Sequence, residues 1–324
     1  LLASDVPDDP YFAGELARYF PAALRERFAG QLQRHSLRRE IVANRLSNSV
    51  VNSAGTSFLF RMTEETGATT ADIVRAHAVA RQIFAMSRLG QQVEGCEQQL
   101  TVATHVAVLL EARKLIERST RWLLRNRRPP LDCEATVRFF SAGVETLSKR
   151  LPDLVTGADR KAIEAATAAL VGAGVPAELA STVAGFDDLF SALDLIEVAG
   201  ALKRPVSHVA AVYFALGDQL ELDWLRDRVI ELPRGDRWQG LARDALRDDL
   251  YQERAALAAD VMRISPGTDP DALIDVWATR NRGAVDRALA MLADIKAGAT
   301  FDPTTLCVAL REIRGLVQER QLGG

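Results

Sequence analysis

Apolar residues recur at helical spacing along most of this chain. One complete stripe follows an i, i+3, i+4, i+7, i+8 pattern, and it consists of Val206, Val209, Ala210, Tyr213 and Phe214. Two further stripes alternate steps of three and four residues, namely Val137, Phe140, Val144, Leu147 and Leu151, and Leu306, Leu310, Ile313 and Val317. No series of alternating or β-branched runs is bounded by turn signals. The pattern predicts an all-α fold, a multi-helix orthogonal or bundle-like array of about a dozen or more helices without a substantial sheet.

Helix boundaries follow from proline, glycine and capping residues. No proline lies between Ala22 and Arg128. The spacing there predicts helices over 21–34, 36–53, 56–66, 70–86 and 101–127, separated at Gly55, Gly67, Gly90 and Gly95. Thr69 and Asp72 have the spacing of a capping box, with Asp in place of Glu.

Proline also marks helix starts elsewhere in the chain. Asp9-Pro10, Asp269-Pro270 and Asp302-Pro303 each place a capping carboxylate before a proline that suits the first helical position. Gly172-Ala173-Gly174 begins a dinucleotide fingerprint, but a helical segment precedes it where a strand is required. We therefore expect a helix end and a turn at these glycines.

Charge is distributed unevenly along the chain. Residues 21–128 carry a net charge of +8, residues 129–324 carry −8, and residues 1–20 carry −3. This asymmetry suggests a basic helical subdomain over 1–130 and an acidic one over 131–324, within one continuous helical region of a longer chain. Opposite charges of this kind favour contacts within the molecule or between subunits.

Binding to nucleic acid is not expected. Residues 64–76 resemble the turn and second helix of a helix-turn-helix motif. However, Asp72 and Ile73 stand where Arg, Asn or Gln would contact bases.

Composition places the chain in a reducing compartment, away from membranes. No apolar run approaches the ~18 to 20 residues that cross a bilayer. Cys96, Cys133 and Cys307 are odd in number and far apart, which argues against a disulfide framework. The start lacks an initiator Met and the basic beginning of a signal peptide. We expect a cytoplasmic protein.

Residues that carry chemistry do not form a recognisable catalytic, cofactor-binding or metal-binding set. The four histidines are scattered, and no Cys-x-x-Cys occurs. The acidic pairs Asp187-Asp188 and Asp248-Asp249 could belong to a magnesium site, but adjacent carboxylates are more typical of a solvated helix surface. The sequence therefore predicts no metal site and no cofactor site in this segment.

Two polar clusters remain as candidates for packing or interface residues. Asn44, Asn48 and Asn52 repeat every four residues along one helix face, so they either face water or fix the register of a helix pair or subunit contact. Arg118, Arg121 and Arg125 surround Trp122. Their guanidinium groups either bind carboxylates or phosphates, or simply complement the dipole at the end of a long helix.

Several stretches together resemble the C-terminal region of the large bacterial NAD-specific glutamate dehydrogenases. They are Glu15–Pro21, Leu37–Asn44, Val51–Gly55, Glu64–Gly67 and Arg121–Asn126. The resemblance is dense over residues 8–130 and carried only by helical patterning beyond. It implies a parent enzyme that converts L-glutamate, NAD⁺ and water to 2-oxoglutarate, ammonium and NADH, with a dehydrogenase core that precedes this region.

No catalytic residue of that family can be placed on this chain, so the segment alone is predicted to be inactive. The resemblance implies a helical region that contributes to assembly or regulation and packs on the catalytic core of the same chain and on neighbouring subunits of a homo-oligomer. Two alternatives stay open: an independent helical scaffold that binds another protein, and an all-α enzyme whose site is not evident from the sequence.

Overall fold

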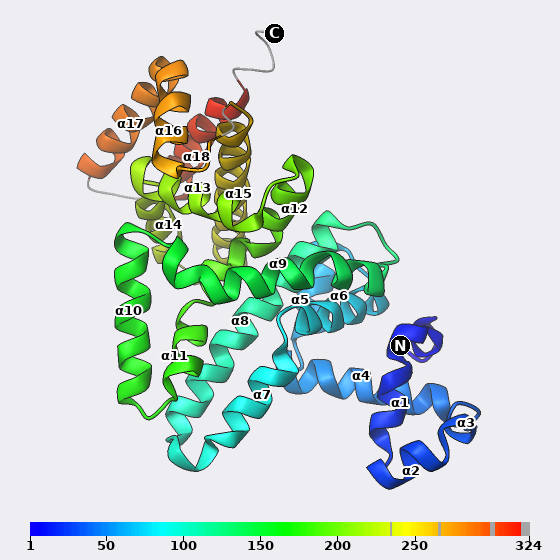
Figure 1. Ribbon diagram of the computed structural model, residues 1–324. Helices are drawn as coiled ribbons and strands as arrows, with labels where there is room; N and C mark the ends of the chain where they lie inside the picture. Colours follow the sequence, from blue (N-terminus) through cyan, green and yellow to red (C-terminus); the bar gives the residue numbers. More distant parts are fainter. Residues whose placement is uncertain (234, 265–266, 299–301, 319–324) are drawn as a thin grey trace. The chain divides into compact units, whose positions relative to one another are not determined.

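The chain is an assembly of α-helices. The computed structural model describes residues 1–233, 235–264, 267–298 and 302–318, and these ranges hold eighteen α-helices, four short 3-10 helices and no strand (Figure 1). The all-α prediction is confirmed. The helices form two compact units, one of Leu1–Val144 with Leu170–Phe190, the other of Glu145–Ala169 with Ser191–Gly324.

The first unit is organised around the long helix α8. Its helices are α1 (Ala13–Tyr19), α2 (Ala22–Arg27), α3 (Ala29–Leu32), α4 (Arg38–Ala54), α5 (Phe58–Thr66), α6 (Thr70–Ile83), α7 (Met86–Gly95), α8 (Val102–Asn126) and α11 (Ala177–Ala184), together with the first part of α9 (Cys133–Leu154). Helix α6 packs along α8, α5 contacts both, and α11 lies against α7 and α8. The core is built from fully buried side chains such as Phe58, Met62, Ile73 and Leu115.

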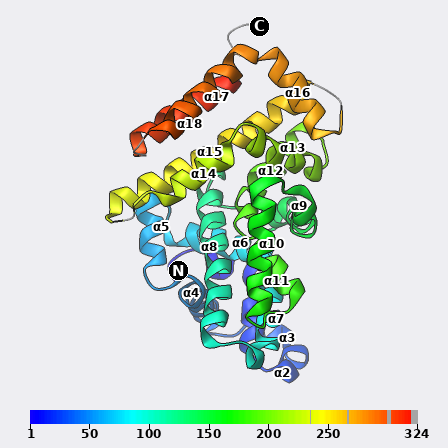
Figure 2. The ribbon, with the colours of Figure 1, turned by 90° about the vertical axis from the view of Figure 1, so that its left-hand side faces the viewer.

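The second unit surrounds another long helix, α15 (Arg237–Ile264). Its other helices are α12 (Ala192–Leu202), α13 (Val206–Gln219), α14 (Leu222–Glu231), α16 (Pro270–Arg280), α17 (Arg282–Ala297) and α18 (Pro303–Gln318), with most of α10 (Gly157–Gly172). Figure 2 shows α15 in yellow with α18 in red alongside it, and the two helices are in contact. Tyr213, Leu216, Leu225 and Trp277 are fully buried in this unit.

Most of the expected helix boundaries are confirmed. Thr69 and Asp72 form the capping box at the start of α6: the Thr69 hydroxyl accepts from the Asp72 amide at 3.2 Å, and the Asp72 carboxylate accepts from the Thr69 amide at 3.3 Å. Asp302 caps α18 by accepting from the Thr305 amide at 2.7 Å. Asp269 occupies the expected position before α16, but its side chain makes no capping hydrogen bond.

Two expected boundaries are wrong. The helix predicted over 21–34 is interrupted at Phe28, whose ψ of 19° ends α2 before α3 begins. The helix predicted over 70–86 ends at Ile83, and α7 follows after Ala85, which adopts a positive φ of 50°. The sequence pattern did not predict α7 because Gly90 and Gly95 are typical helix breaks, although Met86, Leu89 and Val93 are buried at helical spacing.

Candidate functional site

Arg118 and Arg121 are buried in the core of the first unit. The Arg121 Nε donates to Glu65 Oε2 at 2.7 Å, which ties α8 to α5. The Arg118 Nε donates to the Phe190 carbonyl at 3.3 Å, and its guanidinium lies 5.1 Å from the Phe190 ring centroid. Arg125, one turn further along α8, is exposed. Arg118 and Arg121 thus each contact a partner from another part of the unit, and Arg125 lies on the exposed side of the helix.

The three asparagines of α4 lie on its exposed face. The Asn48 Nδ2 donates to Asn44 Oδ1 at 3.0 Å, so the stripe forms hydrogen bonds within itself. Asn52, at the end of the stripe, lines the cavity described next. Whether the stripe fixes the register of a helix pair or of a subunit contact stays a prediction.

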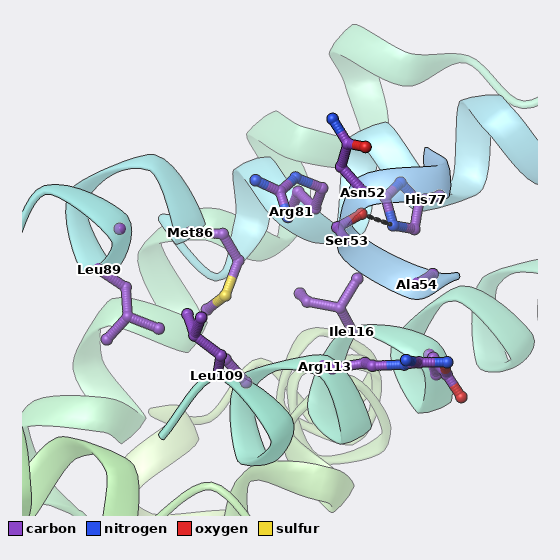
Figure 3. Close-up of a pocket in the computed structure, with 13 residues that line it drawn as sticks. Asn52, Ser53, Ala54, His77, Arg81, Met86, Leu89, Leu109, Arg113 and Ile116 are labelled. Atoms are coloured by element: carbon purple, nitrogen blue, oxygen red, sulfur yellow. Dashed lines mark hydrogen bonds and ion pairs between the residues drawn. The ribbon is translucent and has the colours of Figure 1, made fainter. Parts of the chain in front are cut away.

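A cavity of about 170 Å³ lies inside the first unit, between α4, α6, α7 and α8 (Figure 3). Its apolar wall is formed by side chains from α7 and α8, namely Met86, Leu89, Leu109, Ala112 and Ile116. Its polar residues are Asn52 and Ser53 from α4, His77 and Arg81 from α6, and Arg113 and Glu117 from α8. Residues far apart in the sequence therefore contribute to one volume.

Two of these polar groups form an ion pair with each other. The Arg113 Nε donates to Glu117 Oε1 at 2.7 Å, and Arg61 Nη2 donates to Glu117 Oε2 at 3.0 Å. Gly55 ends α4 with a φ of 85°, and a Cβ there would lie 3.3 Å from the Arg113 guanidinium, so the glycine leaves room for this ion pair. Glu117 thus holds two guanidinium groups, Arg113 and Arg61, beside the cavity.

His77 is a neutral residue of the core. It is 1% exposed, and its Nε2 lies 3.0 Å from the Ser53 hydroxyl. Burial lowers the pKa of His77 to about 3, and the nearby charge of Arg81 acts in the same direction. The imidazole therefore carries no charge at neutral pH and pairs with Ser53 as a neutral hydrogen-bonding group.

Arg81 lines the cavity without an ion pair to any residue that the structure describes. Among the described residues, no carboxylate lies within ion-pair distance of its guanidinium, and no hydrogen-bond acceptor is matched to it. Burial lowers its pKa, while Glu15 opposes that change. A half-buried cation without an ion-pair partner lies at the wall of the cavity.

The first half of α8 exposes a row of aliphatic side chains. Val102 is 82% exposed, and Val106, Leu109 and Leu110 are 44–48% exposed. These positions follow i, i+4, i+7, i+8 and so share one helix face. Contiguous exposed apolar surface of this kind is typical of a contact with another part of a protein.

The second unit contains a buried charge network that the sequence pattern did not predict. Arg254 donates to Asp223 Oδ1 at 2.6 Å and to the carbonyls of Tyr213 and Phe214 at 2.7 and 3.2 Å. Arg226 reaches both carboxylate oxygens of Asp159 at 2.9 and 2.7 Å. The signal in the sequence was an arginine inside the apolar stripe of Leu250, Leu257 and Val261.

The glycines that begin a dinucleotide fingerprint serve another purpose. Gly172 ends α10, and Gly174 has a φ of 91°. A Cβ on Gly174 would lie 3.1 Å from the Gln99 carbonyl oxygen, so close backbone packing requires this glycine. A dinucleotide site needs a strand before the loop. These residues therefore do not fit NAD.

Two other kinds of feature are absent from the described ranges. No three His, Cys, Asp or Glu side chains gather there as a metal site would require. No helix in the same ranges is long and apolar enough to span a bilayer.

All three cysteines are free, with Cys96 and Cys133 buried and Cys307 exposed.

Comparison with known proteins identifies relatives along the whole chain. The family model described as "Glutamate dehydrogenase, C-terminal" matches residues 1–315. The NAD-specific glutamate dehydrogenase of Mycobacterium tuberculosis is 38% identical over 319 residues, 98% of this chain, and that of Pseudomonas aeruginosa is 35% identical over all 324 residues. The corresponding protein of Halomonas elongata is 34% identical over 319 residues. The chain spans 20% of the length of each of these relatives. The chain therefore belongs to the family of glutamate dehydrogenase C-terminal regions.

Proposed function

We propose that this chain is the non-catalytic C-terminal region of a large NAD-dependent glutamate dehydrogenase and that it contributes to assembly or regulation of the enzyme. The full-length protein would oxidise L-glutamate with NAD⁺ and water to 2-oxoglutarate, ammonium and NADH. Support comes from the family match over residues 1–315 and from relatives named NAD-specific glutamate dehydrogenase. Substrate and NAD would bind in the part of the protein outside this chain.

The observation that carries the assembly role is the exposed aliphatic face of α8. Burying a fully exposed aliphatic side chain contributes about 1.5–3 kcal/mol, and three of these four are already about half buried in this chain, so covering the face would stabilise a contact by a few kcal/mol. We assign this face to the catalytic core of the same polypeptide, because the chain is only 20% of the length of its relatives. Neighbouring subunits of a homo-oligomer would then meet around this contact.

We also place the enzyme in the cytoplasm. The three cysteines of this chain are free, and two of them are buried as thiols. Burial raises the pKa of the Cys133 thiol to about 12, so the reactive thiolate form is suppressed. Unpaired cysteines are typical of proteins from reducing compartments.

The role is tested by placing charges on the α8 face of the full-length enzyme. The double variant Val106→Asp, Leu110→Asp would bury two carboxylates if the face is covered, which is strongly unfavourable. The matched control is Val276→Asp on α16, where the valine is 40% exposed. We expect the double variant either to lower the oligomer mass measured by light scattering or to lower the turnover of glutamate by at least about tenfold. Wild-type mass and turnover in the double variant would overturn the proposal.

A second experiment tests the non-catalytic character of the chain. A ligand that binds the folded state raises its melting temperature. We expect neither NAD⁺ nor glutamate to change the melting temperature of the isolated 324-residue chain. An increase of several degrees with either one would show that a substrate site lies within these residues.

A further inference from the structure

The cavity of the first unit is not used by the proposed function. Its volume of about 170 Å³ exceeds the roughly 30 Å³ that one water takes up in the liquid, so a small organic molecule fits. All thirteen residues that line it come from α4, α6, α7 and α8, so its shape depends on one unit alone. Asn52 of α4 is exposed and also lines the cavity, which gives the cavity an opening to the surface that does not depend on the α8 face.

One side of the cavity is apolar. Met86, Leu89 and Ile116 are 3–6% exposed, and Figure 3 shows Met86, Leu109 and Ile116 pointing toward the same volume. No charged group comes from α7 into this wall. This side therefore accommodates a short hydrocarbon group.

The other side of the cavity carries one cation without an ion-pair partner among the described residues. Glu117 accepts hydrogen bonds from both Arg113 and Arg61, so both of these guanidinium groups are held in ion pairs. His77 is neutral and hydrogen-bonded to Ser53. Arg81 is held by no such ion pair with a described residue, and Figure 3 shows its guanidinium beside the Asn52 side chain.

We propose that this cavity binds a small monocarboxylate with a short aliphatic tail. The carboxylate would pair with the Arg81 guanidinium, which can donate two parallel hydrogen bonds to it, and the Asn52 amide would donate another. The tail would lie among Met86, Leu109 and Ile116. The carboxylate of the ligand would be the counterion of Arg81, which has no ion pair with any described residue.

The available donors favour a monoanion over a phosphate ester, because Arg81 is the one lining arginine without an ion pair among the described residues. A phosphate near neutral pH carries close to two negative charges and would require a second available cation. Arg113, the nearest candidate among the lining residues, already shares Glu117 with Arg61. A neutral ligand would leave Arg81 half-buried without a counterion, which costs free energy.

The test uses the full-length protein and a photoreactive probe, so that the binding site itself is mapped. The probe is 4,4-azipentanoate, a five-carbon carboxylate with a diazirine on its tail, and the matched neutral probe is 4,4-azipentanol. After irradiation, mass spectrometry locates the labelled peptides. We expect the acid to label peptides of α7 and α8 that contain Met86, Leu109 or Ile116, and the alcohol to label them at least about tenfold less. Excess pentanoate should compete.

Variants separate the charge from the cavity. Arg81→Ala should lower labelling by the acid at least about tenfold, because a charge-assisted hydrogen bond is lost, and Arg81→Lys should keep part of it. Arg88→Ala, which removes an exposed arginine of α7 outside the cavity, is the control and should label as the wild type does. Leu109→Trp enlarges a side chain of the apolar wall and should also abolish labelling. Equal labelling by acid and alcohol, or undiminished labelling of Arg81→Ala, would overturn the proposal.

Discussion

Two arginines, one in each unit, interrupt apolar helix faces and have opposite surroundings. Arg254 lies one helical turn after Leu250 and one turn before Leu257 on α15. It donates hydrogen bonds to Asp223 and to the carbonyls of Tyr213 and Phe214. Arg81 follows His77 on α6, and no described residue forms an ion pair with it. The first arginine holds helices of its unit together, whereas the second is left to interact with a ligand.

The partners of Arg254 explain how a charge is tolerated at full burial. Burial opposes its positive charge, but Tyr213 and Asp223 outweigh this and the pKa of Arg254 is raised. The guanidinium also lies 4.1 Å from the Tyr213 ring centroid. Every face of the group therefore has a partner, and losing one of them leaves another buried group unsatisfied.

The largest expected effect is the loss of this network. Arg254→Met would leave Asp223 and two carbonyls without their donor, and breaking a buried ion pair typically costs about 3–5 kcal/mol. Urea denaturation of the chain should show this loss in the free energy of unfolding. The control Arg263→Met changes an exposed arginine of the same helix and should stay within about 0.5 kcal/mol of the wild type. A similar small change in both variants would contradict the assigned importance of Arg254.

A smaller loss of stability is expected when a methyl group is placed against the same network. A Cβ on Gly217 of α13 would overlap the Arg254 guanidinium and lie 2.6 Å from Asp223 Oδ2. Gly217→Ala should therefore destabilise the chain by about 1–3 kcal/mol, although alanine favours helices. The control Gly240→Ala in α15 meets no atom within 4 Å and should stabilise by about 0.5–1 kcal/mol. If both substitutions stabilise the chain, the close packing at Gly217 is disproved.

In the first unit, His77 should make stability depend on pH. Its pKa is about 3 in the folded state, against 6.5 for an unperturbed histidine, so below pH 6.5 the unfolded chain binds a proton that the folded chain does not. The stabilising contribution is complete above pH 6.5 and is lost as the pH falls toward 3, by up to about 1.4 kcal/mol per pH unit. His77→Gln removes the group that titrates, so its free energy of unfolding should lack this pH dependence. The difference in free energy of unfolding between wild type and variant should therefore change between about pH 7 and about pH 4.5. Parallel curves for variant and wild type would exclude this linkage.

The smallest expected effect concerns the capping box of α6. Thr69→Ala removes the hydroxyl that accepts from the Asp72 amide and should cost about 1 kcal/mol. The control Ser57→Ala lies at the start of α5, where the serine makes no capping hydrogen bond, and should change stability by only a few tenths. Thermal denaturation of the two variants compares them, and equal melting temperatures would show that the box contributes nothing.

Local signals in the sequence predicted the helices well, because they depend on neighbours along the chain. Thr69 and Asp72 identify a helix start, and the stripe from Val206 to Phe214 identifies α13. The glycines of α7 gave the wrong prediction, since Gly90 is tolerated inside a helix that buries Met86 and Val93 on the same face.

The cavity could not be predicted in the same way, because its residues meet only through tertiary packing. Asn52 stands out by its spacing along α4, but Arg81 and Leu109, which share its cavity, are distant in the sequence. The sequence left open whether Arg118 and Arg121 bind carboxylates or phosphates or complement a helix dipole, and only the fold brings Glu65 and the Phe190 carbonyl to them. A sequence shows where an arginine stands and not which partners the fold supplies.

The most direct test of the assembly role is the accessibility of the α8 face in the full-length enzyme. A Val106→Cys substitution allows the labelling rate of this position by a thiol reagent to be compared between the full-length protein and the isolated chain, with mass spectrometry locating the label. Val106 is 48% exposed in this chain, so fast labelling is expected there. The proposed contact predicts labelling at least about tenfold slower in the full-length enzyme, and equal rates would contradict it.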